Sequence, residues 1–217
     1  MPATDWDALV SQVHSARRFS GLLAEKLADL TSLEIDLVGV RAALARLQRE
    51  LRKEQPDMTI VGALWTTAIV RYMRCFVKGA RTRLDAKLLF SPHGADCLDF
   101  HEFILHTRDK HVSHAVNEQE SVAIGVHFDE SGNVTALTEF NMAMLVYQSP
   151  LLRRLGWLTR ICLRWCRKQK PPIRLGVRQE IERLAPADRL ALPFLRVEVP
   201  VSTTESLQRR RKRLSKH

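Results

Sequence analysis

The segment LEIDLVGVRAALARLQREL, residues 33–51, decides the fold class of this chain. Its apolar side chains recur at three- and four-residue intervals, which is the spacing of one face of an α-helix. These positions are Leu33, Leu37, Val40, Leu44, Leu47 and Leu51. The other side of the same helix is basic, with Arg41, Arg46, Arg49, Arg52 and Lys53. The segment therefore predicts a long amphipathic helix with one face in a core and the other in water.

Signals on either side of this helix predict where it begins and ends. The tetrapeptide TSLE, residues 31–34, has the form of a capping box, in which side chains satisfy free backbone amides at a helix start. We therefore expect the first fifty or so residues to form two helices, broken at 31–34. The tripeptide QPD, residues 55–57, should end the second of them, because proline disfavours the helical conformation in the residue before it.

Two further helices are predicted in the middle of the chain. An apolar-rich helix is expected at about 59–78, and Gly79 offers a natural stop. After a short basic segment, 81–87, the turn SPHG at 91–94 leads into a helix at about 95–116. These two helices would form the centre of a helical bundle.

A β-hairpin followed by more helices is predicted in the C-terminal half. The turn segment DESGN, 129–133, separates two runs of alternating or nearly alternating apolar residues. These are Val122, Ile124, Val126 and Phe128, then Val134, Leu137 and Phe140. Helical spacing returns from Pro150, the pair of prolines at 171–172 should end that helix, and a short helix is expected near 176–184.

The predicted fold is thus mainly α: a helical bundle with a small β-hairpin and additional C-terminal helices. We expect N-terminal helices at 1–55, which complete the bundle or form a sensor, and a core at 56–128. Hairpin completion and basic helices should occupy 129–200, and a disordered basic tail 201–217.

Composition narrows the class of protein. The 217 residues carry a net charge of +10, which favours a polyanionic partner, either nucleic acid or an anionic membrane surface. No apolar segment is long enough for a signal peptide or a membrane span, so we expect a cytoplasmic location. The cysteines Cys75, Cys97, Cys162 and Cys166 form no C-x-x-C pair and predict buried thiols in a reducing compartment. The absence of a nucleotide-binding glycine loop and of a G-x-S-x-G elbow argues against an ATPase, a Rossmann enzyme and an ester hydrolase.

Groups suited to phosphodiester chemistry fall together in RDKHVSH, residues 108–114. An arginine offers a planar, permanently charged fork for phosphate, and a histidine exchanges a proton near neutral pH. At about 100° per residue, Arg108 and His111 lie roughly 60° apart, as do His111 and His114, so the three share a broad face of the predicted helix. Asp109 points away from this face and is better placed to orient a neighbour or a partner chain.

This motif resembles that of the HEPN superfamily, whose signature is an arginine followed, after four to six residues, by a histidine. Asp109 fits the polar residue that commonly follows the arginine, and RDK with a later histidine is most similar to HEPN proteins associated with abortive infection. The apolar run before the motif resembles the family's last core helix, with Phe100, Phe103, Ile104 and Leu105. The resemblance covers about residues 56–128.

The resemblance implies an endoribonuclease that needs no metal and no cofactor. His114 would take the proton from an RNA 2'-hydroxyl, whose oxygen attacks the adjacent phosphate, while Arg108 stabilises the charge on the phosphoryl oxygens. It also implies a homodimer with two motifs facing one cleft, and a role in a bacterial toxin or antiphage-defence system with an antitoxin or other defence protein as partner. His111 is either a second proton carrier or an imidazole packed at the dimer interface.

A zinc site is the competing interpretation of the histidines His101, His106, His111 and His114. The segment HEFILH, 101–106, is one residue longer than the H-E-x-x-H motif, so its two histidines do not share a helix face. With no cysteine pair nearby, we expect no metal site. His101 and His106 are expected at the surface or at the edge of the core.

A second basic feature lies in the helix that follows Pro150. Four arginines, Arg153, Arg160, Arg164 and Arg167, fall within roughly 60° of one another on that helix. They could follow a nucleic-acid backbone, with Trp157 or Trp165 stacked on a base, or form a solvated face with both tryptophans in the core. A non-catalytic helical module that binds nucleic acid or protein therefore stays open as an alternative, as does an amphipathic membrane-surface protein.

Overall fold

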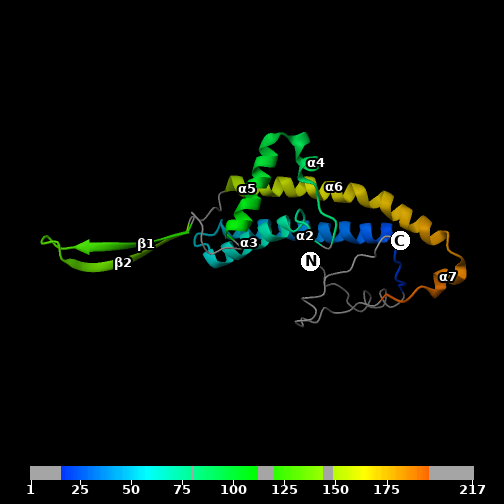
Figure 1. Cartoon of the computed structure of the whole chain (residues 1–217), viewed down its shortest axis with the longest axis horizontal. Coiled ribbons are helices and arrows are strands. Elements are labelled where there is room, and N and C mark those ends of the chain that lie inside the picture. The colour runs from blue at the N-terminus through cyan, green and yellow to red at the C-terminus, as the bar shows by residue number, and fades with distance from the viewer. Residues whose placement is uncertain (1–15, 80, 112–119, 144–148, 196–217) are drawn as a thin grey trace. The chain divides into compact units, whose positions relative to one another are not determined.

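The computed structural model describes residues 16–79, 81–111, 120–143 and 149–195, and their side chains except at 109–111, 120–123, 140–143 and 149 (Figure 1). The helices are α2 (Leu22–Glu50), α3 (Met58–Met73), α4 (Ala86–Phe90), α5 (Ala95–His111), α6 (Ser149–Glu182) and α7 (Pro186–Ala191), and a short 3-10 helix, η1 (Ser91–His93), precedes α5. The strands β1 (Glu120–Phe128) and β2 (Val134–Ala143) form one antiparallel pair. The prediction of a mainly helical fold with a small β-hairpin is confirmed.

The described residues form two compact units. The terminal unit contains those within 1–34, 78–83 and 166–217, and the central unit contains those within 35–77 and 84–165. Helices α2 and α6 each contribute to both units. Each unit is therefore assembled from segments that are distant in the sequence.

Helix α2 is continuous, so the expected break at 31–34 is wrong. The Thr31 hydroxyl donates to the Leu27 carbonyl oxygen at 2.9 Å, four residues back, instead of capping a new helix. The apolar face is buried, with at most 4% exposure at Leu33, Leu37, Val40, Leu44 and Leu47. One long helix buries this face without the extra unsatisfied ends that a break would create.

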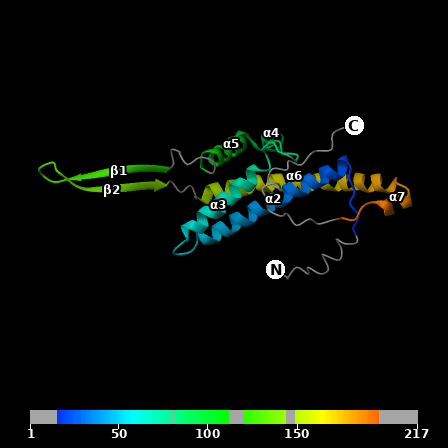
Figure 2. The same ribbon diagram turned by 60° about the horizontal axis from the view of Figure 1, so that its bottom comes forward.

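Helix α3 begins close to the predicted position and ends before it. The Asp57 carboxylate caps it by accepting two backbone N–H groups of the first turn, at 2.9 and 3.2 Å. The last residue is Met73 rather than one next to Gly79, because the chain then turns and the Cys75 carbonyl accepts from the Leu84 amide at 2.7 Å. Figure 2 shows α3 running back beside the C-terminal part of α2.

The connection to α5 is more ordered than the sequence predicts. Where a basic linker was expected, Asp85 caps the short helix α4 by accepting from the Leu88 amide at 3.1 Å. Helix η1 occupies the predicted SPHG turn, and Gly94 adopts a φ of 97°, which residues with a side chain rarely adopt. Helix α5 then packs against α3 and α4 and is described to His111. The remainder of the predicted helix, 112–116, lies outside the described residues.

Strands β1 and β2 form the predicted hairpin, drawn as paired arrows in Figure 1. The Asp129 carboxylate organises its turn by accepting from the backbone N–H groups of Ser131 at 2.9 Å and Asn133 at 2.8 Å. The two strands pair in register up to a bulge between His127 and Phe128. Among the hairpin side chains that the structure describes, the large apolar ones that are exposed are Ile124, Val126, Phe128, Val134 and Leu137.

Helix α6 continues through Pro171 and Pro172, so the expected end at 171–172 is wrong. Each proline removes a backbone donor and crowds the carbonyl four residues back, at a cost of roughly 3 kcal/mol. Packing beyond the prolines holds the helix: Ile173 is 8% exposed, and a Cβ added at Gly176 would lie 2.7 Å from Leu23 Cδ1. The short helix predicted near 176–184 is the end of α6, and α7 was not predicted.

Two other expectations concern the cysteines and membrane segments. Cys75, Cys97, Cys162 and Cys166 are all buried, as predicted. Within the part of the chain that the structure describes, no helix has the length and apolar character needed to cross a membrane.

Candidate functional site

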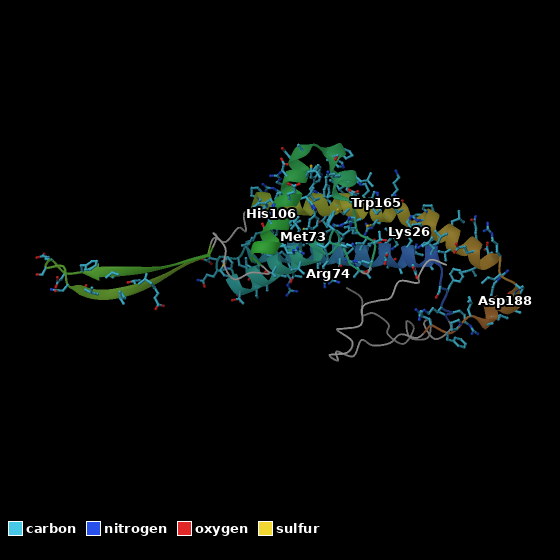
Figure 3. All side chains as sticks on the ribbon, in the orientation of Figure 1. Lys26, Met73, Arg74, His106, Trp165 and Asp188 are labelled. Atoms are coloured by element: carbon cyan, nitrogen blue, oxygen red, sulfur yellow. The ribbon has the colours of Figure 1, made fainter. Side chains whose placement is uncertain are left out.

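Arg108 lies in the last turn of α5, and its side chain is half-buried. Phe100, Ile104 and Thr107, at helical spacing on the same helix, are at most 6% exposed. The Thr107 hydroxyl donates to the carbonyl four residues back at 2.8 Å, whereas His106 is exposed (Figure 3). Burial of this face sets the rotation of α5 that keeps Arg108 at the edge of the core.

The structure describes the RDKHVSH motif in part. Asp109 and His111 belong to α5 by their backbone, and His111 is its last residue. Arg108 and His111 are three residues apart on this helix, and the predicted common face of their side chains stays a prediction. His114 lies outside the described residues, so its convergence with Arg108 stays a prediction.

His101 is a core residue, which corrects the expected position at the surface or core edge. Its Nδ1 lies 3.1 Å from the Tyr72 hydroxyl, and the two residues are 7% and 0% exposed. The rings of Phe76 and Phe90 have their centroids 4.4 and 5.5 Å from that of the imidazole. Burial lowers the pKa of His101 to about 4 and raises the pKa of Tyr72 well above its usual value. His101 is therefore neutral at neutral pH, and it joins α5 to α3 rather than carrying protons.

The four arginines predicted as a basic row on α6 are all exposed, but they have different surroundings. Arg167 belongs to the terminal unit, where its Nε lies 2.7 Å from a Glu34 carboxylate oxygen and Lys170 Nζ lies 2.8 Å from the other. Hydrogen bonds from Lys170 and Arg167 hold the pKa of Glu34 below its ordinary value. Part of the Arg167 charge is thus balanced within the protein. The central unit contains the other three, Arg153, Arg160 and Arg164, which we call the arginine row.

Trp157 lies among the arginines of this row. By helix geometry it is within roughly 60° of each of them around the α6 axis. Its side chain is 39% exposed, whereas Trp165, labelled in Figure 3, is half-buried. Of the two tryptophans considered for stacking, Trp157 is therefore the one whose ring is available at the surface of the arginine row.

A cavity of about 240 Å³ lies beside Trp157 in the central unit. Its apolar lining comes from Cys97, Phe100, Trp157 and Leu158, and its polar lining from His93, Asp96 and Arg154. Cys97, Phe100 and Leu158 are buried while the polar residues are exposed, so the cavity is open to solvent on its polar side.

Arg154 is held in place at this cavity. Its Nη2 donates to the Asp96 carbonyl oxygen at 2.9 Å, and its Cζ lies 4.5 Å from the centroid of the Phe100 ring. On the other side, the rings of His93 and Trp157 meet edge to face with centroids 5.5 Å apart. Burial raises the pKa of the Cys97 thiol, which keeps it protonated and weakly nucleophilic at neutral pH. The cavity is therefore suited to binding rather than to covalent chemistry.

No local pattern in the sequence indicates this cavity. His93 belongs to the SPHG turn, and Arg154 lies about 100° around the helix from Arg153, outside the predicted row. The one available signal was the adjacent pair Arg153 and Arg154, in which the second arginine must face in another direction from the first. The residues from η1 and α5 meet α6 through tertiary packing, which no local pattern shows.

No cluster of three or more histidine, cysteine, aspartate or glutamate side chains that could hold a metal ion occurs among the described residues. No protein-family model, curated protein or solved structure matches this chain.

Proposed function

We propose that this protein is a metal-independent endoribonuclease that acts as a homodimer through Arg108 and His114. The observation that carries the proposal is the position of Arg108, which lies half-buried in the last turn of α5. A reactive arginine must reach a phosphate oxygen, and burial of Arg108 in the core would have argued against this role. The exposed arginine row on α6 adds support, because an RNA backbone needs a basic surface to bind.

The proposed reaction is transfer of a phosphodiester to the neighbouring 2'-oxygen. His114 takes the proton from the 2'-hydroxyl, the oxygen forms a new bond to phosphorus, and the bond from phosphorus to the 5'-oxygen breaks. Arg108 donates hydrogen bonds to the non-bridging oxygens as negative charge builds on them. A protonated histidine, either His111 or a motif histidine of a second copy, returns a proton to the leaving 5'-oxygen. The products are a 2',3'-cyclic phosphate and a 5'-hydroxyl.

The cellular role that we propose follows from the HEPN resemblance of residues 56–128. An RNA-cleaving homodimer of this kind would act in the cytoplasm as a toxin or an antiphage effector, restrained by an antitoxin or another defence protein. We assign Asp109 a positioning role in such a dimer, in keeping with the helical phase that the sequence predicts for it.

The first experiment compares cleavage of labelled RNA, in EDTA, by the wild type and by Arg108→Ala and His114→Ala. We expect cuts ending in 2',3'-cyclic phosphate from the wild type, and a loss of at least a hundredfold in rate for the His114 variant, the usual scale of general base catalysis. His106→Ala is the matched control, because His106 is an exposed histidine on the same helix and should leave the rate unchanged. Equal cleavage by all four proteins would show that another group, or a contaminant, does the chemistry.

The second candidate function is RNA binding without cleavage, which the arginine row and Trp157 favour by themselves. Under this alternative, the wild type binds single-stranded RNA with strong salt dependence but makes no cut, and His114→Ala leaves its affinity unchanged. Measuring affinity and cleavage on the same preparation separates the two functions.

A further inference from the structure

The cavity beside Trp157 plays no part in the proposed cleavage chemistry. Its volume and lining indicate that it binds a separate ligand. At about 240 Å³ it is smaller than the roughly 300–1,000 Å³ typical of sites for drug-sized ligands. It is large enough for one flat ring system but not for a folded cofactor. Phe100, Trp157 and Leu158 supply apolar and aromatic surface for the faces of such a ring.

The polar lining fits the edge of a nucleobase. Arg154 is oriented by its hydrogen bond to the Asp96 carbonyl and by the Phe100 ring, and its remaining N–H groups can donate to a base carbonyl or a phosphate. The Asp96 carboxylate can accept from an exocyclic amine, and His93 adds a ring nitrogen. Donors and acceptors thus lie beside an aromatic surface, which is the combination that single-stranded RNA recognition uses.

The arginine row lies beside this cavity, because Trp157 lines the cavity and lies among the arginines of the row. Arg153, Arg160 and Arg164 span about 16 Å of α6 at 1.5 Å per residue, and Trp157 lies between the first two. Phosphates along this row would bring a base of the same strand to the indole ring. The cavity and the row both belong to the central unit, so their proximity is a property of one compact part of the protein.

We propose that the cavity lined by Phe100, Arg154 and Trp157 binds one unpaired nucleobase of a single-stranded RNA whose phosphates lie along the arginine row. The proposal rests on the RNA binding in the proposed function but not on its cleavage step. It gives the protein a preference for unstacked, single-stranded regions, because a paired base cannot enter the cavity.

The test uses RNA that cannot be cut. Short fluorescent 2'-O-methyl strands lack the attacking hydroxyl, and an abasic strand of equal length carries the same phosphates without bases. We expect the wild type to bind the strand with bases roughly five- to a hundredfold more tightly than the abasic strand, the scale of base stacking on an aromatic side chain. Fluorescence anisotropy at about 0.15 M salt measures both affinities.

Four variants separate the base site from the phosphate contacts. Trp157→Leu should bring affinity for the strand with bases down to that for the abasic strand, and Trp157→Phe should keep most of the preference. Arg160→Gln should weaken both strands by the same factor, since it removes a phosphate contact alone. Trp165→Phe, on the same helix but outside the cavity, is the control and should change neither affinity. Circular dichroism and thermal melting establish that each variant is folded.

Three outcomes would overturn the base site. The first is equal affinity of the wild type for both strands, and the second is a preference for bases that survives Trp157→Leu. The third is tight binding of a small aromatic carboxylate, added as a competitor, that displaces neither strand. If neither strand binds, the RNA part of the proposed function fails with it. If the preference for bases is present but unmodified RNA is never cut, only the cleavage proposal fails.

Discussion

Burial of one imidazole makes the stability of this protein sensitive to pH. His101 has a pKa of about 4 in the folded chain, whereas its ordinary value is 6.5. Between these two pH values the unfolded chain binds a proton at His101 and the folded chain does not. The part of the free energy of unfolding that depends on a neutral His101 is therefore complete above pH 6.5 and is lost as the pH falls toward 4. The shift corresponds to about 3 kcal/mol, because each pKa unit is worth about 1.4 kcal/mol.

We expect His101→Phe to remove this part of the pH dependence. The variant should be less stable than the wild type at pH 7 by about 1 to 3 kcal/mol, since the Tyr72 hydroxyl loses its buried partner, but it should lose much less stability on going to pH 4.5. Urea denaturation at the two pH values measures both effects. His106→Gln, at an exposed position, should retain the wild-type pH dependence. If His101→Phe loses as much stability between pH 7 and pH 4.5 as the wild type does, the loss belongs to other groups, such as the carboxylate of Glu34.

Among helices, α6 shows most directly how packing overrides local preference. Pro171 and Pro172 interrupt its backbone hydrogen bonds, yet the helix continues to Glu182. Ile173 is buried beyond the prolines, and Gly176 lies against Leu23. The tertiary contacts of the last turns therefore outweigh the cost of the prolines.

Replacing these prolines should stabilise the protein. We expect Pro171→Ala and Pro172→Ala each to raise the free energy of unfolding by on the order of 1 to 3 kcal/mol, because each restores a donor and removes a ring clash in a helix interior. Thermal melting measures the gain. Pro186→Ala is the matched control and should have little effect, since Pro186 stands at the first turn of α7, where proline is tolerated. A loss of stability in both α6 variants would mean that the prolines fit a kink that the protein needs.

For the whole molecule, the proposed homodimer predicts that two inactive variants can restore cleavage to one another within a mixed dimer. If two motifs share one cleft, a mixed dimer of an Arg108→Ala copy and a His114→Ala copy retains one intact arginine and one intact histidine, on different copies. We expect the co-expressed mixed dimer to recover part of the cleavage that both parent variants lack. Analytical ultracentrifugation establishes the dimer, and tandem affinity tags isolate the mixed species.

The control for this experiment pairs either single variant with a copy that carries both substitutions. That mixed dimer has no complementary residue to offer and should stay inactive. Inactivity of the first mixed dimer as well would show that each copy completes its own site, and a monomeric wild type that cuts RNA would remove the shared cleft from the mechanism.

Local patterns in the sequence determined the class of fold and the character of its surfaces. The spacing of apolar residues at 33–51 predicted the buried face of α2, and the alternation around 129–133 predicted the hairpin. The helical spacing of the arginines after Pro150 predicted a row of them on the exposed side of α6. These features are readable because burial of one face imposes a fixed period on the residues of a helix or strand.

Tertiary structure alone decided where α2 and α6 continue, which histidine is buried, and where the cavity lies. TSLE is a local helix-start signal and the two prolines are local helix-stop signals, each worth about 1 to 3 kcal/mol, and the burial of several apolar side chains outweighs them. His101 meets Tyr72 from 29 positions away, and Trp157 meets His93 from α6. Such pairs produce no periodic pattern in the sequence, because their residues come from segments that are distant along the chain and meet only when the protein folds.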